Sequence, residues 1–158
     1  MQPEFVQTSM GIIGSLGFAL LFGIRGTKPL GCIALGSGLG WIVYLVSVAG
    51  GHGKAFGMLA SSLVIAACSE ILARVIKTPV ILLLVPMLIP EIPGGDLYYT
   101  MYSLVEGDTD TFVSLLQLVL AEAGAIALGI ILASYAAGLV NNIHRHVHPM
   151  VHSPTSKK

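Results

Sequence analysis

Charged side chains are scarce in this sequence, whereas apolar ones are abundant. Only 10% of the 158 residues are Asp, Glu, Lys or Arg, and 54% are hydrophobic. A soluble domain carries roughly 25% charged residues, so this chain has too few to cover a surface that faces water. The formal net charge is zero, which leaves no basic surplus for a nucleic-acid partner. We therefore predict an all-α integral membrane protein, surrounded by the lipid bilayer.

Cysteine and catalytic motifs are also sparse. The two cysteines, Cys32 and Cys68, lie in apolar runs at a spacing that fits no metal site or redox pair, so we interpret them as small buried residues. The sequence contains neither GxSxG nor HExxH, which argues against an enzyme. We predict no cofactor and no metal. The N-terminal MQPEFVQT lacks a basic region, so no cleavable signal is expected.

The apolar segments predict about five transmembrane helices, since each needs about 20 mostly apolar residues. They cover residues 5–23, 30–49, 55–73, 79–105 and 112–139. A single transmembrane domain then occupies residues 1–140, and residues 141–158 form a polar, His-rich cytoplasmic tail. His144 and His148 are four residues apart, but no third ligand has a suitable spacing, so we expect a solvated tail without metal.

Lysine and arginine are divided unevenly among the connections. The first and third connections carry two each and the tail carries three, whereas the second has only Lys54 and the fourth, VEGDTD, has none. These residues prefer the cytoplasmic side of a membrane. We therefore predict that the N-terminus lies outside and the C-terminus in the cytoplasm.

Small residues recur every four positions in three of the predicted spans. They are Gly11, Ser15, Ala19 and Gly23 in the first, Gly36 and Gly40 in the second, and Ala121, Ala125, Gly129, Ala133 and Ala137 in the last. Small residues on one face let two helix backbones approach closely, so we predict packing seams. The last seam faces either a neighbouring span or another subunit, and we predict an oligomer.

The sequence VPMLIPEIPGGDLYYTM interrupts the fourth predicted span. A helix from Val80 to Ile89 rises roughly 15 Å, which is half of a hydrocarbon core about 30 Å thick. The stretch PEIPGGD is therefore predicted to be a break near the midplane. Irregular backbone survives at that depth only inside protein or beside a watery cavity. An extracellular loop and a re-entrant hairpin are the alternatives, although the hairpin would place the C-terminal basic residues outside.

Discontinuous helices form binding sites in transporters, so we predict a substrate site for a carboxylate at this break. The second half-helix would present free N–H groups to an anion. Asp96 either caps that half-helix or takes part in the site, and Glu91 could instead face water in a vestibule. The predicted substrate-binding residues are Pro90, Glu91, Pro93, Gly94, Gly95, Asp96, Tyr98 and Tyr99.

Two further acids fall within predicted spans. Glu122 lies ten residues into the last span, where a charge costs at least about 3 kcal/mol. It must pair, protonate or face water, and we predict that it carries the coupled proton. A hydrogen bond to another helix or subunit is the alternative. Glu70 lies four residues before Arg74 and is explained by an ion pair, and Trp41 is interpreted as packing.

Several of these features together resemble the threonine/serine exporter family. They are FGI before a basic loop, a Gly-rich span ending near Trp41, the pattern SE–AR–K–P from Ser69 to Pro79, and P–IPGG–YYTM. The resemblance covers about residues 16–140. More specifically, the sequence looks like the small, separately encoded subunit that corresponds to the C-terminal membrane half of the family.

The resemblance implies a subunit of a bacterial plasma-membrane secondary transporter that exports small carboxylate-bearing solutes. Threonine and serine are the expected solutes, and proton coupling is the expected energy source. It also implies a partner, a longer subunit that matches the N-terminal half of fused exporters. A dicarboxylate (succinate-type) exporter subunit and a non-transporting assembly subunit are the alternatives.

Overall fold

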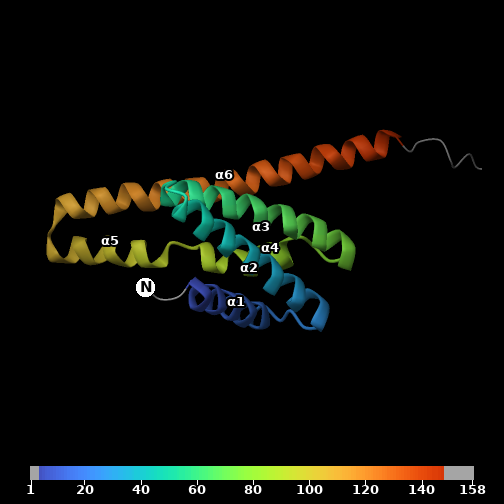
Figure 1. The fold of residues 1–158 in the computed structure, drawn as a ribbon, viewed down its shortest axis with the longest axis horizontal. Helices are drawn as coiled ribbons and strands as arrows, with labels where there is room; N and C mark the ends of the chain where they lie inside the picture. The colour runs from blue at the N-terminus through green and yellow to red at the C-terminus, as the bar shows by residue number, and fades with distance from the viewer. Residues whose placement is uncertain (1–3, 148–158) are drawn as a thin grey trace, which may run out of the picture.

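Six α-helices and one short 3₁₀ segment make up the computed structural model, which describes residues 4–147 and the side chains of residues 5–140. They are α1 (Glu4–Leu21), α2 (Thr27–Ala49), α3 (Lys54–Ile76), α4 (Ile81–Leu88), η1 (Ile89–Glu91), α5 (Gly94–Glu106) and α6 (Thr109–Val147). The described residues contain no strand, which confirms the all-α prediction. The longest helix, α6, runs along almost the whole molecule (Figure 1).

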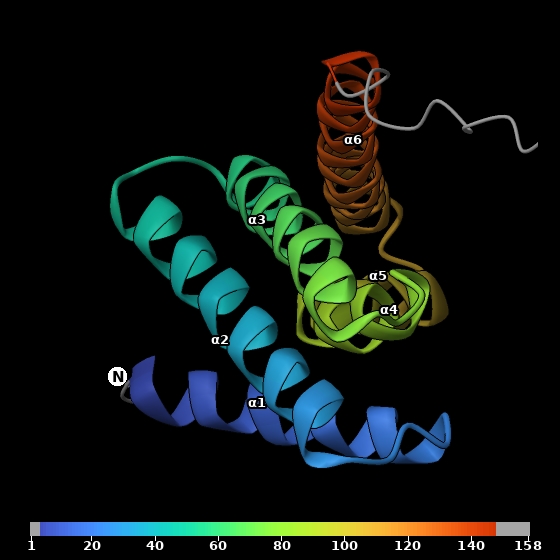
Figure 2. The ribbon, with the colours of Figure 1, turned by 90° about the vertical axis from the view of Figure 1, so that its right-hand side faces the viewer.

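Three of the helices, α2, α3 and α6, are long and apolar enough to cross a membrane. The segments Ile81–Glu91 and Gly94–Glu106 form a fourth candidate span, bent by 53° at the break between them. The predicted interruption of this segment between two helices is therefore confirmed. The predicted number of five is approximate, because α1 is a shorter apolar helix and lies across the others (Figure 2).

The helices α2 and α3 form the centre of the bundle. The helices α1 and α4 pack against α2, and α6 packs along α3. The apolar core lies among α1 to α4, where Ile33, Ile65, Leu83 and Met87 are fully buried. Consequently α3 connects this core to α6.

Glycine and other small residues form the predicted seams of α1 and α2. A Cβ atom on Gly36 would overlap Met87, and one on Gly40 would overlap Ile65. In α1, Ser15 and Ala19 are fully buried. The last member of that ladder, Gly23, is different: it lies in the turn after the helix with φ of 74°.

The ladder on α6 faces a neighbouring helix. Ala125, Gly129 and Ala133 are buried, while Ala121 is exposed. Gly129 lies directly against Ser62 and the backbone of α3. The seam is therefore an intramolecular contact between α3 and α6, with Ala121 outside it.

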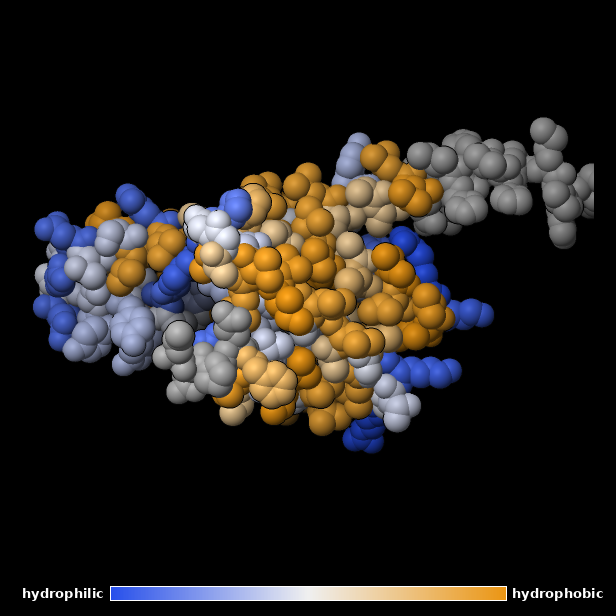
Figure 3. Space-filling model, in the orientation of Figure 1, coloured by the Kyte–Doolittle hydropathy of each residue, from blue (hydrophilic) through white to orange (hydrophobic). Residues whose placement is uncertain are grey.

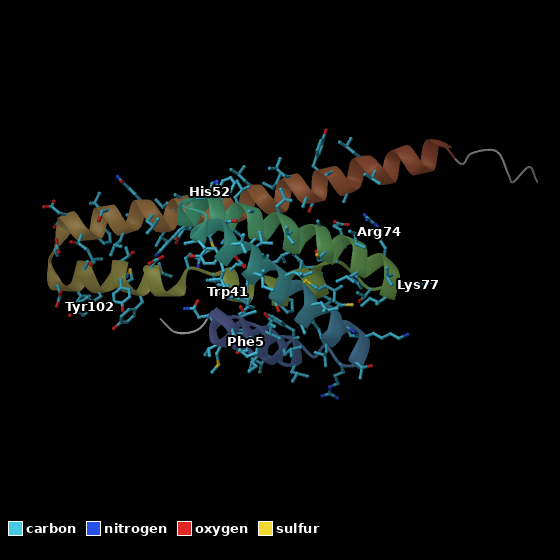
Figure 4. The ribbon with its side chains drawn as sticks, viewed as in Figure 1. Phe5, Trp41, His52, Arg74, Lys77 and Tyr102 are labelled. Carbon is cyan, nitrogen blue, oxygen red and sulfur yellow. The ribbon has the colours of Figure 1, made fainter. Side chains whose placement is uncertain are left out.

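The surface between the two ends of the bundle is apolar. Figure 3 shows orange, hydrophobic residues over the middle of the molecule and blue residues toward both ends. Arg74 and Lys77 lie at one end, and His52, in the α2–α3 connection, lies toward the other (Figure 4). An apolar band between polar ends is the surface that a bilayer would surround.

The helix α5 and the first part of α6 form a hairpin that extends past the α2–α3 connection (Figure 1). Packing of α5 is almost entirely against α6. Gly107 makes the turn with φ of 80°, and Asp108 Oδ1 accepts a hydrogen bond of 3.2 Å from the Thr111 N–H. The hydrogen bonds from Thr111 hold the pKa of Asp108 below its usual range.

Candidate functional site at the broken helix

The break between α4 and α5 is short. Only Ile92 and Pro93 lie outside helical segments, because η1 ends at Glu91 and α5 begins at Gly94. Gly94, Gly95 and Asp96 were predicted to be unwound, but they form the first turn of α5. The interpretation of Asp96 as an N-cap is wrong, since Pro93 occupies that position and no side chain caps the helix.

The carboxyl group of Glu91 is fully buried at this break. The Ser61 hydroxyl of α3 donates a hydrogen bond of 2.5 Å to Glu91 Oε2. Oε1 lies beside Gly40 of α2 and has no hydrogen-bond partner among the described residues. The alternative of a water-facing vestibule residue is therefore wrong. A buried carboxyl group with one free oxygen requires a proton, a water molecule or a ligand.

Ser61 fixes the depth of Glu91 along α3. It lies seven residues after Lys54 and fifteen before Ile76. At about 1.5 Å per residue, Glu91 is about 10 Å from one end of α3 and about 22 Å from the other. The break therefore lies between the middle of the bundle and the Lys54 end, closer to that end than the prediction placed it.

Three helices contribute side chains to a charge cluster formed by Lys54, Asp96 and Glu122. Lys54 Nζ of α3 lies 2.7 and 3.0 Å from the two carboxylate oxygens of Asp96 at the start of α5. Glu122 of α6 is fully buried. No N–H or hydroxyl group donates to it within the described part of the chain; it contacts the carboxyl group of Asp96, and the charges of Asp96 and Lys54 act on it.

Two aromatic side chains of α2 lie beside these charges. The rings of Trp41 and Tyr44 are 5.1 Å apart, and a Cβ atom on Gly57 of α3 would overlap the Tyr44 ring. Lys54, Glu122, Asp96 and Glu91 all act electrostatically on the Tyr44 hydroxyl. The contact with Tyr44 agrees with the interpretation of Trp41 as a packing residue, and its buried Nε1 has no acceptor among the described residues. Figure 4 places Trp41 near the break.

The family model described as "Threonine/Serine exporter, ThrE" matches residues 7–136 of this chain. The chain belongs to the threonine/serine exporter family. The matched region runs from α1 into α6, so it contains Glu91, the charge cluster and the whole of the broken helix. No match was found among curated proteins or among solved structures. The expected membrane transport class is confirmed at the level of the family.

The other predicted site residues have different surroundings from the buried acids. Pro90 packs against Gly11 of α1, and Gly94 and Gly95 adjoin open space. Tyr98 and Tyr99 are 64% and 60% exposed on α5, and their rings contact each other at 5.5 Å. The structure therefore brings Glu91, Asp96 and Glu122 toward one region and leaves the two tyrosines on the outside of the hairpin.

The remaining predictions concern the Glu70–Arg74 ion pair, the two cysteines and the absence of a metal site. The Glu70–Arg74 ion pair is confirmed at 2.9 Å, and Cys32 and Cys68 are free. Among residues 5–140, whose side chains the structure describes, no three potential ligands are grouped as a metal site would require. The side chains of the His-rich tail, residues 141–158, lie outside the described residues.

Sequence reasoning missed the contribution of Lys54, Ser61 and Tyr44. Lys54 was used only as an orientation signal, although it is the one basic residue in its connection. The absence of any other Lys or Arg from this connection was the only feature of the sequence that could have indicated a role for Lys54. Ser61 and Tyr44 are ordinary residues for a membrane helix, and their sequence positions indicate nothing about the carboxyl groups they approach.

Proposed function

We propose that this exporter-family protein is a subunit of a bacterial plasma-membrane secondary transporter. It exports small carboxylate-bearing solutes, of the threonine and serine type, in exchange for protons. The observation that carries the proposal is a pair of fully buried carboxyl groups, Glu91 and Glu122, beside a broken helix.

Burial is what suits these carboxyl groups to proton coupling. A carboxylate in an apolar environment is costly unless a proton, a cation or hydrogen-bond donors neutralise it. Ser61 supplies one donor to Glu91, whereas among the described residues Glu122 faces only another carboxyl group, that of Asp96, which favours a proton on Glu122. Glu122 is therefore the proton carrier in this proposal, and Glu91 is a second protonatable group deeper in the bundle.

The broken helix supplies the solute site. Gly94 and Gly95 carry no side chains and adjoin open space, so a solute can approach the backbone at the start of α5. The N–H groups there favour a carboxylate. Gly94 and Gly95 lie in the same first turn of α5 as Asp96, so a solute bound there would be next to the Asp96 side chain.

A longer partner subunit is part of the proposal. The helix α6 is buried along one side only, and large apolar residues cover its other sides: Leu120, Leu128, Ile131, Leu132 and Tyr135 are all more than half exposed. The partner and the lipid bilayer would cover this surface between them. Oligomerisation would use the same exposed faces.

The charge distribution supports an orientation with the Lys54 end outside, because Arg74 and Lys77 lie at the other end (Figure 4). In a background with Cys32 and Cys68 replaced by alanine, a cysteine at Gly95 should react with a membrane-impermeant maleimide added outside the cells. A cysteine at Thr27 should react only after the membrane is permeabilised. The reverse pattern would contradict the orientation.

An efflux assay tests the function itself. Cells loaded with threonine, serine or succinate should lose threonine and serine faster when they express this chain with the longer subunit. Collapse of the proton gradient should remove the difference. Equal efflux with and without the chain, for all three solutes, would contradict the proposal, and a gain for succinate alone would favour the dicarboxylate alternative.

A further inference from the structure

The basic residue of the charge cluster is isolated from all the others. Lys54 is the only Lys or Arg between residues 29 and 73, and none occurs between residues 78 and 144. Its side chain is 44% exposed, and that of its partner Asp96 is 23% exposed. Because both are accessible at the end of α3, a solute can reach this ion pair from the aqueous side.

The cluster contains one more acid than base. Asp96 neutralises Lys54, and Glu122 is a further, fully buried carboxyl group that contacts Asp96 and receives no N–H or hydroxyl donor among the described residues. One base and two acids suit a zwitterion, which brings one carboxylate and one ammonium group. A dicarboxylate would bring two negative charges to a site that has a single base and two acids.

We propose that Lys54 receives the carboxylate of the transported solute and that Asp96, released from Lys54, receives its ammonium group beside Glu122. Each charged group of the proposed amino-acid solute then has its own receptor residue. This inference rests on the proposed function and adds the residues that select the solute.

Proton and solute would compete at this cluster. An ammonium group next to Asp96 is attracted by an ionised Glu122, and a proton on Glu122 removes that attraction. Binding of one thus weakens binding of the other, which is the relation an exchanger needs. The Tyr44 hydroxyl of α2 lies within electrostatic range of all three charges of the cluster.

The test compares solutes that lack one charged group. Exchange of labelled threonine is measured with the label added on the Lys54 side, while threonine, threonine amide or 3-hydroxybutanoate is added on that side as competitor. The amide has no carboxylate and 3-hydroxybutanoate has no ammonium group. Each should compete about 10-fold more weakly than threonine with the unmodified protein, because each loses a charge-assisted contact.

Substitutions of Lys54 and Asp96 then show which of the two residues receives the carboxylate of threonine and which receives its ammonium group. With Lys54→Met, threonine should compete about 10-fold more weakly, to the level of its amide, whereas the amide itself should be unaffected. With Asp96→Asn, threonine should fall to the level of 3-hydroxybutanoate. Lys54→Arg, which keeps the charge, should retain the preference of the unmodified protein for threonine over its amide.

Arg74→Met is the matched control, since it removes an ion-paired base from the other end of the same helix. It should leave both competitor ratios unchanged, with membrane abundance measured for every variant. Unchanged ratios in both Lys54→Met and Asp96→Asn would overturn this inference alone. Absence of threonine, serine and succinate export by the unmodified protein would overturn the proposed function and this inference with it.

Discussion

Replacement of Glu122 by glutamine is expected to reduce proton-driven export to the background rate of cells without the protein. Glutamine has nearly the same shape but binds no proton at any pH used in the assay. No N–H or hydroxyl group donates to this acid among the described residues, and the glutamine amide can still donate to the Asp96 carboxyl group that Glu122 contacts, so the folded state should keep its stability. The measurement is threonine efflux with and without an imposed pH gradient, at equal membrane abundance.

Two other glutamates serve as controls for this experiment. Glu70 belongs to the ion pair at the opposite end of α3, and Glu106 accepts a hydrogen bond from Tyr102 on the exposed hairpin. Glutamine at either position should leave the gradient dependence unchanged. If the Glu122→Gln protein still responds to the gradient as the unmodified protein does, Glu122 has a structural role instead.

Replacement of Gly129 by leucine is expected to force α6 away from α3. A Cβ atom at this position would overlap the Ser62 side chain and lie 2.8 Å from the Leu59 carbonyl oxygen and 3.0 Å from the Leu63 nitrogen. Backbone atoms cannot rotate aside, so one helix must move. Overpacking of this kind costs about 1–3 kcal/mol or more, and the thermal midpoint in detergent should fall by roughly 5 °C.

Gly124 offers the matched control on the same helix. A Cβ atom there would meet nothing within 4 Å, so leucine at Gly124 should leave the midpoint close to that of the unmodified protein. Equal midpoints for the Gly124→Leu and Gly129→Leu proteins would show that the close contact between α3 and α6 does not stabilise the fold.

The sequence predicted the long helices well because their signal is local. The segments predicted at residues 30–49 and 55–73 correspond to α2 (Thr27–Ala49) and α3 (Lys54–Ile76). Proline and glycine also predicted the interruption of the fourth span, since Pro90 and Pro93 have no N–H to donate. They end a helix but do not determine the direction of the next one. The sequence therefore could not predict that α5 packs against α6.

The candidate site was harder to predict because its residues are distant in sequence. Lys54 and Asp96 are 42 positions apart, and neither residue has a local pattern that indicates the other. The predicted depth of Glu122 assumed that its helix begins at the membrane surface near residue 112. Since α6 begins at Thr109 beyond the α2–α3 connection, Glu122 lies near Lys54 at the end of α3 instead of deep in the bundle.

The close crossing at Gly129 has a mechanical consequence. Asp96 and Glu122 belong to α5 and α6, which pack together, whereas Lys54 and Ser61 belong to α3. Glu122 lies seven residues from Gly129, or about 10 Å along the helix. A small rotation of α6 about Gly129 would move Asp96 and Glu122 away from Lys54, while α6 and α3 stay in contact at Gly129.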